Sequence, residues 1–347
     1  MSPALHKGRG EPRLSWKYSV SDSKDRWGYK QRRKGGVSRF LVTGGAGFIG
    51  SHIAEALVKK GYFVRILDDF SSGREENLKG FRDKIELIRG DIRNKDTCLK
   101  ACEGIDFISH QAALRSVPKS FNNPQDYNEV NIQGTLNMLE AALKNKVKSF
   151  VFASSSSIYG DTTRFPESED DYPRLISPYA LTKLAGEYYC RIFYENYGLN
   201  TVALRYFNVF GPRQALDDEY AVVVPKFISC MLKGESPPIY GTGRQSRDFT
   251  YIGNVVKANI LSMQKGSLLR GNVFNIAGGK DYSILELVGI LNKIMRKDLK
   301  PVFLPKRPGD VLKTKASLKR AKKLLGFKPN LNLRQGLDLT VEWFRRK

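Results

Sequence analysis

The sequence predicts an α/β fold, in which a doubly wound parallel sheet carries a smaller C-terminal α/β lobe. Short apolar runs alternate with longer amphipathic segments, and this alternation is typical of βαβ units with helices on both faces of a sheet. A glycine-rich turn joins the first apolar run to the first amphipathic segment. With 347 residues, 41% of them hydrophobic, the chain is long enough to bury a sizeable core.

The expected strands are short apolar runs bounded by small or polar residues. "SRFLVTGG" and "YFVRILDD" are the first two, and "FIGSHIAEALVKKG" between them predicts an amphipathic helix that ends at Gly61. "SPYALTKLAGEYY" predicts a second helix, which starts near Ser177 and Pro178. The strand ranges expected in chain order are 38–45, 62–69, 84–91, 105–113, 147–156, 201–211 and 271–279.

Changes in composition divide the chain into three parts. Residues 1–36 are basic and have no apolar periodicity, so we expect a disordered extension. Residues 37–211 contain the regular strand and helix pattern and predict the first domain. Residues 212–347 are less regular and predict the smaller lobe, with some segments that return to the first domain.

The net charge of +23 at pH 7 fits either nucleic-acid binding or a solvated, lysine-rich surface. Beyond the extension the basic residues are scattered and form no stripe with aromatic residues, so we expect no nucleic-acid partner. The four cysteines have no neighbouring Cys or His cluster, which predicts reduced thiols and no metal site. No apolar run approaches the roughly 18 residues of a membrane span, so we expect a cytoplasmic protein without membrane association.

The stretch "TGGAGFIG" supplies Gly44, Gly47 and Gly50 between an apolar strand and an amphipathic helix. In that context the first glycine permits a tight turn, the second lets the backbone approach a pyrophosphate, and the third lets helix and strand pack closely. The free N–H groups at the start of the helix then face the phosphates. The pattern predicts a dinucleotide-binding site.

An acidic residue indicates which dinucleotide binds. Asp68 ends the second strand, 18 residues after Gly50, where a carboxylate accepts hydrogen bonds from a ribose 2′-OH and repels a 2′-phosphate. The sequence therefore favours NAD, while the nearby Arg74 leaves NADP as the alternative. "GDIR" after the third strand places Asp91 and Ile92 near the adenine.

The helix that starts "SPYALTK" carries Tyr179 and Lys183 four residues apart, which places them on one face. A tyrosine with its usual pKa of about 10 is a poor base at neutral pH. The Lys183 ammonium and a positively charged nicotinamide are expected to lower that pKa and make Tyr179 a catalytic base.

A run of serines, in "FASSSSIYGD", ends a predicted central strand, at the sheet edge where open α/β sheets bind ligands. Ser155 is the expected catalytic serine, which hydrogen-bonds the reacting oxygen. Ser156 and Ser157 are expected to line the substrate pocket, and Ser154 to be structural.

These residues together resemble the extended short-chain dehydrogenase/reductases and, among them, the nucleotide-sugar 4-epimerases. The likeness extends from about Arg39 to Phe344 and is carried by "TGGAGFIG", "LDDFSSG", "GDIR", "HQAA", "SSSSIYGD", "SPYALTK", "LRYFNVFGPRQ", "GTGRQSRDFTYI" and "RPGDV". The chain is most similar to bacterial and archaeal enzymes that act on UDP-N-acetylglucosamine. The resemblance implies a Rossmann-type NAD-binding domain over 37–211 and a mainly substrate-binding lobe over 212–347.

The resemblance also implies a reaction. Tyr179 removes the proton of the sugar 4-OH while hydride passes from C4 to NAD, the 4-keto sugar rotates, and hydride returns to its other face. Lys183 lowers the tyrosine pKa and holds the nicotinamide ribose. The implied contacts of NAD are Gly44, Gly47, Phe48, Ile49, Gly50, Asp68, Ser72, Gly73, Asp91, Ile92, Gln111, Ala112, Ala113, Asn131, Tyr179 and Lys183.

The same motifs imply a site for the UDP-sugar. Arg247 and Arg307 would clamp the diphosphate, because bidentate arginines match phosphate oxygens. Residues 115–120 resemble a loop on the sugar side. The implied substrate contacts are Ser156, Ser157, Asn208, Val224 at the uracil, Arg247, Arg307, Asp310 at the uridine ribose, and Thr314.

Thr314 occupies a position where a bulky tyrosine in such epimerases blocks a 2-N-acetyl group. Its small side chain predicts that UDP-N-acetylglucosamine and UDP-N-acetylgalactosamine fit, and that UDP-glucose and UDP-galactose bind more loosely. Ser156 and Ser157 replace the Asp-Glu pair of the 4,6-dehydratases, which argues against dehydration. UDP-glucuronate epimerases and decarboxylases stay as alternatives.

A non-catalytic NAD-binding or nucleic-acid-binding protein is the alternative of another class, and the intact Tyr, Lys and Ser set argues against it. Members of the family usually form homodimers through two helices per subunit. Segments 125–145 and 177–197 would supply those helices here.

Overall fold

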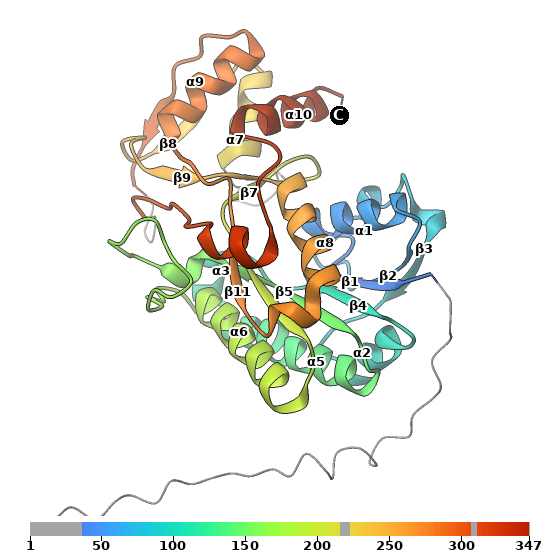
Figure 1. Cartoon of the computed structure of the whole chain (residues 1–347). Helices are drawn as coiled ribbons and strands as arrows, with labels where there is room; N and C mark the ends of the chain where they lie inside the picture. The colour runs from blue at the N-terminus through green and yellow to red at the C-terminus, as the bar shows by residue number, and fades with distance from the viewer. Residues whose placement is uncertain (1–36, 216–222, 307–310, 347) are drawn as a thin grey trace, which may run out of the picture. The chain divides into compact units, whose positions relative to one another are not determined.

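The sheet at the centre of the structure is parallel and has seven strands in the order β11-β6-β5-β4-β1-β2-β3 (Figure 1). The structure is a computed structural model that describes residues 37–215, 223–306 and 311–346; the predicted extension over 1–36 lies outside this range. The strands of the sheet are β1 (Arg39–Thr43), β2 (Phe63–Asp68), β3 (Ile85–Arg89), β4 (Phe107–His110), β5 (Ser149–Ser155), β6 (Thr201–Tyr206) and β11 (Val273–Ile276). The order runs outward from β1 in both directions, which confirms the doubly wound fold.

Helices cover both faces of the sheet, and each face has its own apolar core. On one face lie α1 (Phe48–Lys59), α8 (Ile252–Leu269) and η5 (Ala321–Leu325). On the other lie α2 (Lys95–Cys102), α5 (Gly134–Lys144) and α6 (Pro178–Tyr197). Because both faces are covered, all seven residues of β5 are buried.

A third apolar core lies in the smaller lobe, between α7 (Val223–Leu232), α9 (Ile284–Met295) and α10 (Leu333–Arg345). Figure 1 shows these three helices grouped beyond one edge of the sheet. The strands outside the main sheet are β7 (Val209–Phe210), β8 (Pro238–Tyr240), β9 (Ser246–Asp248), β10 (Thr250–Tyr251), β12 (Asp281–Ser283) and β13 (Val302–Leu304). The remaining short helices are η1 (Glu75–Asn77), η2 (Arg82–Lys84), α3 (Val117–Asn122), α4 (Pro124–Tyr127), η3 (Asn128–Gln133) and η4 (Ser156–Tyr159).

Two elements from the second half of the chain, β11 and α8, belong to the first domain. β11 pairs with β6, and α8 contacts α1, β5 and β6. The domain boundary at residue 211 remains a prediction. Residues 252–276, which follow it in the chain, belong to the main sheet and to the helices that cover it.

The strand expected over 201–211 is two strands in the structure. β6 stays in the main sheet, whereas β7 pairs with β10 instead. Between them Asn208 adopts a positive φ of 35°, a conformation that interrupts a strand. The chain therefore leaves the sheet at Asn208 and turns toward the lobe.

A buried ion pair fastens α6 to the sheet. Both nitrogens of the Arg205 fork donate to Glu187, Nε to Oε1 and Nη2 to Oε2, each at 2.8 Å. The two side chains are each 5% exposed. Ser154 Oγ also donates to Glu187 Oε1 at 2.5 Å. Glu187 thereby joins α6 to both β5 and β6.

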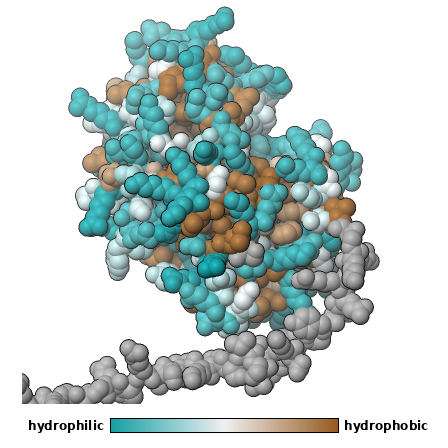
Figure 2. All heavy atoms as spheres, in the orientation of Figure 1, coloured by the Kyte–Doolittle hydropathy of each residue, from teal (hydrophilic) through white to brown (hydrophobic). Residues whose placement is uncertain are grey.

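Hydrophilic side chains cover most of the face drawn in Figure 2, with hydrophobic atoms gathered near its middle. Over the described ranges, no helix combines the length and the apolar character that a membrane span requires.

We predict that Glu187→Gln lowers the free energy of unfolding by about 3–5 kcal/mol, because it leaves the Arg205 guanidinium buried without a counter-ion. Chemical denaturation measures this change. The matched control is Glu195→Gln on the same helix, whose ion pair with Arg191 has side chains 50% and 66% exposed. That change should cost less than about 1 kcal/mol. Equal losses in the two variants would contradict the role given to the buried pair.

Candidate functional site

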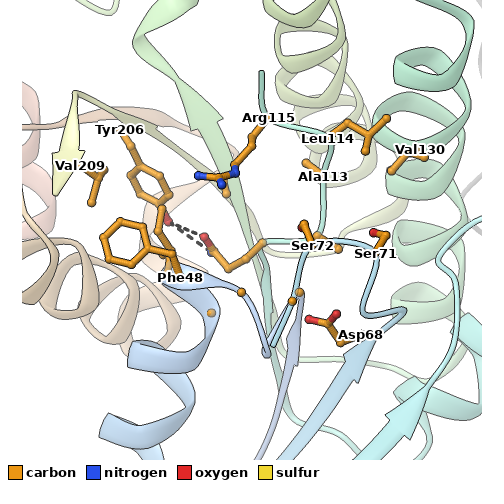
Figure 3. A pocket seen from close by; sticks show the side chains of 18 of the residues that line it. Phe48, Asp68, Ser71, Ser72, Ala113, Leu114, Arg115, Val130, Tyr206 and Val209 are labelled. Atoms are coloured by element: carbon orange, nitrogen blue, oxygen red, sulfur yellow. Dashed lines mark hydrogen bonds between the residues drawn. The ribbon is translucent and has the colours of Figure 1, made fainter. Parts of the chain in front are cut away.

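A cavity of about 480 Å³ opens at the carboxyl ends of β1, β2, β4 and β5 (Figure 3). Strands on the two sides of β1 send their connections in opposite directions, which leaves a crevice at this edge of a doubly wound sheet. The predicted residues that line it are Gly44, Gly47, Phe48, Ile49, Gly50, Asp68, Ser72, Gly73, Ile92, Gln111, Ala112, Ala113, Ser155, Ser156, Ser157, Tyr179, Lys183 and Asn208.

The turn between β1 and α1 is built for close backbone approach. Gly44 has a φ of +62°, and a Cβ there would lie 2.8 Å from the backbone nitrogen of Ala112. A Cβ on Gly50 would lie 2.1 Å from the carbonyl oxygen of Gly44. No side chain caps the start of α1 at Gly47. The first N–H groups of α1 therefore stay available to a phosphate, and the turn fits the pyrophosphate of a dinucleotide.

Asp68 is held in a fixed orientation at the end of β2. Its Oδ2 accepts a hydrogen bond from the Ala46 N–H at 2.8 Å, and its Oδ1 accepts one from the Phe70 N–H at 2.9 Å. Burial raises the pKa of Asp68, and these two hydrogen bonds oppose the rise. A Cβ on Gly73 would lie 2.6 Å from Oδ1. The remaining lone pairs of this carboxylate suit the hydroxyls of a ribose.

Tyr179 and Lys183 lie near the start of α6, as the sequence predicts. The helix begins at Pro178, and the Ser177 side chain accepts a hydrogen bond from the Ala180 N–H at 3.2 Å. The Lys183 ammonium lies 5.9 Å from the centroid of the Tyr179 ring. It donates a hydrogen bond to the carbonyl oxygen of Ala153 at 2.9 Å, so that β5 fixes its position.

The two groups differ in how burial changes their acidity. Burial raises the pKa of Tyr179, and a hydrogen bond with Ser155 and the charge of Arg115 oppose that rise. Burial lowers the pKa of Lys183 to about 8. Lys183 is not among the groups that act on the pKa of Tyr179 in the protein alone, where burial has the largest effect. The role given to Lys183 stays a prediction for the complex with NAD. Further positive charge in the cavity is needed to make the phenolate accessible at neutral pH.

The serines at the end of β5 point in different directions. Ser154 donates to Glu187 and belongs to the attachment of α6. The Ser155 hydroxyl accepts a hydrogen bond from the Ser157 N–H and donates one to Ser157 Oγ, both at 3.1 Å. Both Ser154 and Ser155 line the cavity. Because successive residues of a strand face opposite sides, the Ser155 side chain points away from that of Ser154, whose hydroxyl is bound to Glu187.

Tyr206 is a wall residue that the sequence analysis did not single out. Its hydroxyl accepts a hydrogen bond from Asn259 Nδ2 at 2.8 Å and one from Gln111 Nε2 at 3.2 Å. Figure 3 shows dashed lines at the hydroxyl of Tyr206. Gln111 Nε2 also donates to Ser109 Oγ at 3.0 Å. The only sequence signal was its position two residues before Asn208 in the same motif.

Gln214 also lines the cavity and was not predicted. The side chain is 4% exposed, and its Nε2 donates to the Val209 carbonyl oxygen at 3.0 Å. Its Oε1 is buried and has no hydrogen-bond partner in the described part of the chain. A buried acceptor of this kind calls for a donor. Its place in "GPRQ", six residues after Asn208, was the available signal.

Several predicted residues lie outside the cavity wall. Asp91 forms an ion pair with Arg93 at 2.6 Å, although its neighbour Ile92 lines the cavity. Asn131 is 2% exposed and hydrogen-bonds the backbone of Leu114. The residues Arg307 and Asp310 lie outside the described ranges.

The predicted substrate contacts Val224, Arg247 and Thr314 do not line the cavity. Val224 is fully buried in the lobe core. The Arg247 guanidinium donates to the carbonyl oxygens of Ser246 at 2.8 Å and Val311 at 2.6 Å. The Thr314 hydroxyl accepts a hydrogen bond from Asn208 Nδ2 at 3.0 Å. Thr314 thus reaches the cavity through Asn208.

No group of three or more His, Cys, Asp or Glu residues in the described ranges is arranged to hold a metal ion.

Comparison with known proteins gives matches over most of the chain. The family model described as "NAD dependent epimerase/dehydratase family" matches residues 40–277. The solved structure of a UDP-N-acetylglucosamine 4-epimerase from Methanobrevibacter ruminantium M1, in complex with UDP-N-acetylmuramic acid, is 41% identical with a TM-score of 0.85. The likeness covers 89% of this chain and 99% of that one.

Two further relatives have comparable similarity. A solved UDP-glucuronic acid 4-epimerase from Bacillus cereus, in complex with UDP-glucuronic acid and NAD, is 35% identical with a TM-score of 0.82, over 89% of this chain and 99% of that one. A UDP-glucose 4-epimerase from Mycolicibacterium smegmatis is 38% identical over 313 residues, which are 89% of this chain and 99% of the relative.

We predict that Gly50→Ala weakens NAD binding by about tenfold or more, because the new methyl group would press on the Gly44 carbonyl and distort the turn. Titration calorimetry with NAD measures this loss. Gly289→Ala is the matched control, because a Cβ at that position in α9 meets no atom within 4 Å. It should leave NAD affinity unchanged and stabilise the helix by about 0.5–1 kcal/mol. If Gly50→Ala left the affinity for NAD unchanged, the glycine turn would not be the binding site of the dinucleotide.

Proposed function

The chain belongs to the NAD dependent epimerase/dehydratase family, and we propose that it catalyses the 4-epimerisation of a UDP-sugar. The observation that carries the proposal is the position of Tyr179, Lys183 and Ser155 in the wall of the cavity that also contains the glycine turn and Asp68. A base, a cation and a hydroxyl beside a dinucleotide site are the groups that reversible oxidation of an alcohol requires.

NAD is the cofactor, and its binding groups are separate from the reacting ones. The glycine turn and the start of α1 hold the pyrophosphate, Asp68 holds the adenosine ribose, and Lys183 holds the nicotinamide ribose. The bound cofactor supplies the group that accepts a hydride and later returns it, together with a positive charge. Because the two hydride transfers cancel, NAD would be regenerated in each cycle and would not need to leave, and we propose that it is tightly bound.

The protein's own residues manage the proton. Tyr179 takes it from the sugar 4-OH as C4 is oxidised to a ketone, and gives it back to the same oxygen after the ring has presented its other face. Ser155 hydrogen-bonds that oxygen and keeps it within reach of Tyr179. One proton and one hydride leave and return, so the product is the C4 epimer with no net oxidation.

The sugar that the cavity suits best carries a 2-N-acetyl group. Thr314 is small, and its hydroxyl is already occupied by Asn208. We therefore assign UDP-N-acetylglucosamine and UDP-N-acetylgalactosamine as substrates, with UDP-glucose and UDP-galactose as weaker ones. The Bacillus cereus relative makes UDP-glucuronate the alternative.

The apolar face of α6 supports a homodimer through segments 125–145 and 177–197. Leu181, Tyr188 and Ile192 are 51%, 57% and 43% exposed, and their spacing places them on one side of the helix. Phe193, by contrast, is 5% exposed and belongs to the core of the subunit. A second copy of α6 would cover the exposed face.

We predict that Tyr179→Phe lowers kcat by about 10²–10⁴-fold, because the general base is lost. The assay incubates purified protein separately with UDP-N-acetylglucosamine, UDP-glucose and UDP-glucuronate, with and without added NAD, and resolves the products by proton NMR. Wild-type protein should interconvert the N-acetylated pair without net NADH. Tyr172→Phe, at a tyrosine that is 88% exposed, is the control with unchanged kcat. Full activity of Tyr179→Phe, or accumulation of NADH or CO₂, would refute the proposal.

We predict that Thr314→Tyr lowers kcat/KM for UDP-N-acetylglucosamine by about tenfold or more relative to UDP-glucose, because the ring would fill the space of the acetamido group. Thr314→Val is the matched control. Thr314→Val removes the hydrogen bond to Asn208 but keeps the side-chain volume. It should therefore lower kcat/KM for the two substrates by the same factor. If Thr314→Tyr lowered kcat/KM for both substrates by the same factor, position 314 would act only through Asn208, and the prediction would be wrong.

A further inference from the structure

Arg115 brings a positive charge to the end of the cavity that contains Tyr179. It lines the cavity, and its charge acts on the Tyr179 hydroxyl. Figure 3 shows its guanidinium reaching from the segment of Ala113 and Leu114 into the cavity, toward Tyr206. The side chain of Arg115 is exposed, and none of the ion pairs found among the described residues includes it. The guanidinium is therefore open to a ligand.

The backbone on both sides of Arg115 is clamped by buried side chains. Asn131 accepts a hydrogen bond from the Leu114 N–H at 2.8 Å and donates one to the Leu114 carbonyl oxygen at 3.0 Å. The Tyr127 hydroxyl accepts from the Ser116 N–H at 3.0 Å and donates to the Ser116 carbonyl oxygen at 2.7 Å. Asn131 and Tyr127 are only 2% and 3% exposed. The arginine thus projects from a rigid support, which reduces the entropy lost when it binds a ligand.

The loop that carries Arg115 is also tied to the base. The ring of Tyr127 packs edge-on against the ring of Tyr179, with 6.3 Å between the centroids. One side chain therefore supports the backbone beside Arg115 and contacts Tyr179. This arrangement fixes the backbone that carries Arg115 relative to Tyr179.

Charge is distributed unevenly along the cavity. The carboxylates in its wall are Asp68 and Asp69, and Figure 3 places Asp68 beside Ser71 and Ser72, apart from Arg115. The cations near Tyr179 are Arg115 and Lys183, and Lys183 is directed at the Ala153 carbonyl oxygen. A guanidinium fork with no counter-ion pairs best with a carboxylate, which it can bind through two parallel hydrogen bonds.

We propose that Arg115 is a specificity-determining residue that adds affinity for UDP-sugars with a carboxylate next to C4. This preference concerns the substituents beside C4 and is separate from the 2-N-acetyl preference assigned to the position of Thr314. The inference rests on the proposed function, because Tyr179 at the 4-OH fixes which sugar atoms lie near Arg115. The substituents beside C4 are those on C3 and C5. A uronic acid carries its carboxylate on C5. A sugar with an acidic ether group on O3 carries its carboxylate on the C3 side of C4.

The test measures binding to NAD-loaded protein in a Tyr179→Phe background, so that turnover does not interfere. Titration calorimetry uses UDP-glucuronate and UDP-N-acetylmuramate as the acidic ligands, and UDP-glucose and UDP-N-acetylglucosamine as their neutral counterparts. Arg115→Gln should weaken one or both acidic ligands by about 10- to 100-fold and the neutral ligands by less than about threefold. Arg115→Lys should retain part of the preference, because it keeps the charge and loses the fork.

The ligand that loses affinity identifies the position of the carboxylate, with UDP-glucuronate reporting C5 and UDP-N-acetylmuramate reporting O3. Arg191→Gln on the exposed face of α6 is the control for loss of one positive charge, and should leave all four affinities unchanged. An equal loss for all four ligands in Arg115→Gln would overturn the inference, since the arginine would then contact the shared diphosphate. No loss for any ligand would overturn it too.

Failure of this inference differs from failure of the proposed function. If the wild-type protein epimerises a UDP-sugar but Arg115→Gln does not change the preference for acidic ligands, the proposed function stands and the inference about Arg115 is wrong. If the protein turns over no UDP-sugar but Arg115→Gln weakens the binding of the acidic ligands alone, the carboxylate site stands and the proposed epimerase activity is wrong.

Discussion

The attachment of α6 to β5 is the constraint on which the reacting groups depend. Lys183 donates to the Ala153 carbonyl oxygen, and Glu187, one turn further along, accepts from Ser154. Ser155 comes next on the strand and faces the cavity. Consecutive residues of β5 therefore anchor the helix and supply the catalytic hydroxyl. A shift of the helix by one turn, about 5.4 Å, would separate Tyr179 from Ser155.

The same attachment explains why a full ion pair is buried there. An isolated charge under α6 would act on Lys183 and Tyr179 through a medium of low dielectric constant. The carboxylate of Glu187 and the guanidinium of Arg205 neutralise each other at 2.8 Å, and so add little net field. Geometry can be fixed in this way without disturbing the acidity of the reacting groups, which leaves that acidity to Arg115 and the bound ligands.

The sequence predicts the parts of the site that depend on local spacing. Gly44, Gly47 and Gly50 form one turn, and Tyr179 and Lys183 share one helix face, so that a short stretch is enough to identify each. The fold class and the sequence of strands and helices along the chain follow from similar local patterns, whereas the order of strands within the sheet comes from the structure. The break at Asn208 was missed because one polar residue within a mostly apolar run does not reveal where the run divides. The division depends on the pairing of β7 with the distant β10.

Other site residues depend on contacts between distant segments, and these the sequence does not reveal. Tyr206 is fixed by Asn259, 53 residues later, and the backbone around Arg115 is fixed by Asn131 and Tyr127. The predicted contact of Asn131 with the cofactor stays a prediction, and the structure adds that its side chain holds the backbone of Leu114. A side chain that holds a loop need not touch a ligand to shape the site. The rigid loop is what turns Arg115 from one basic residue among many into a charge with a defined place beside the base.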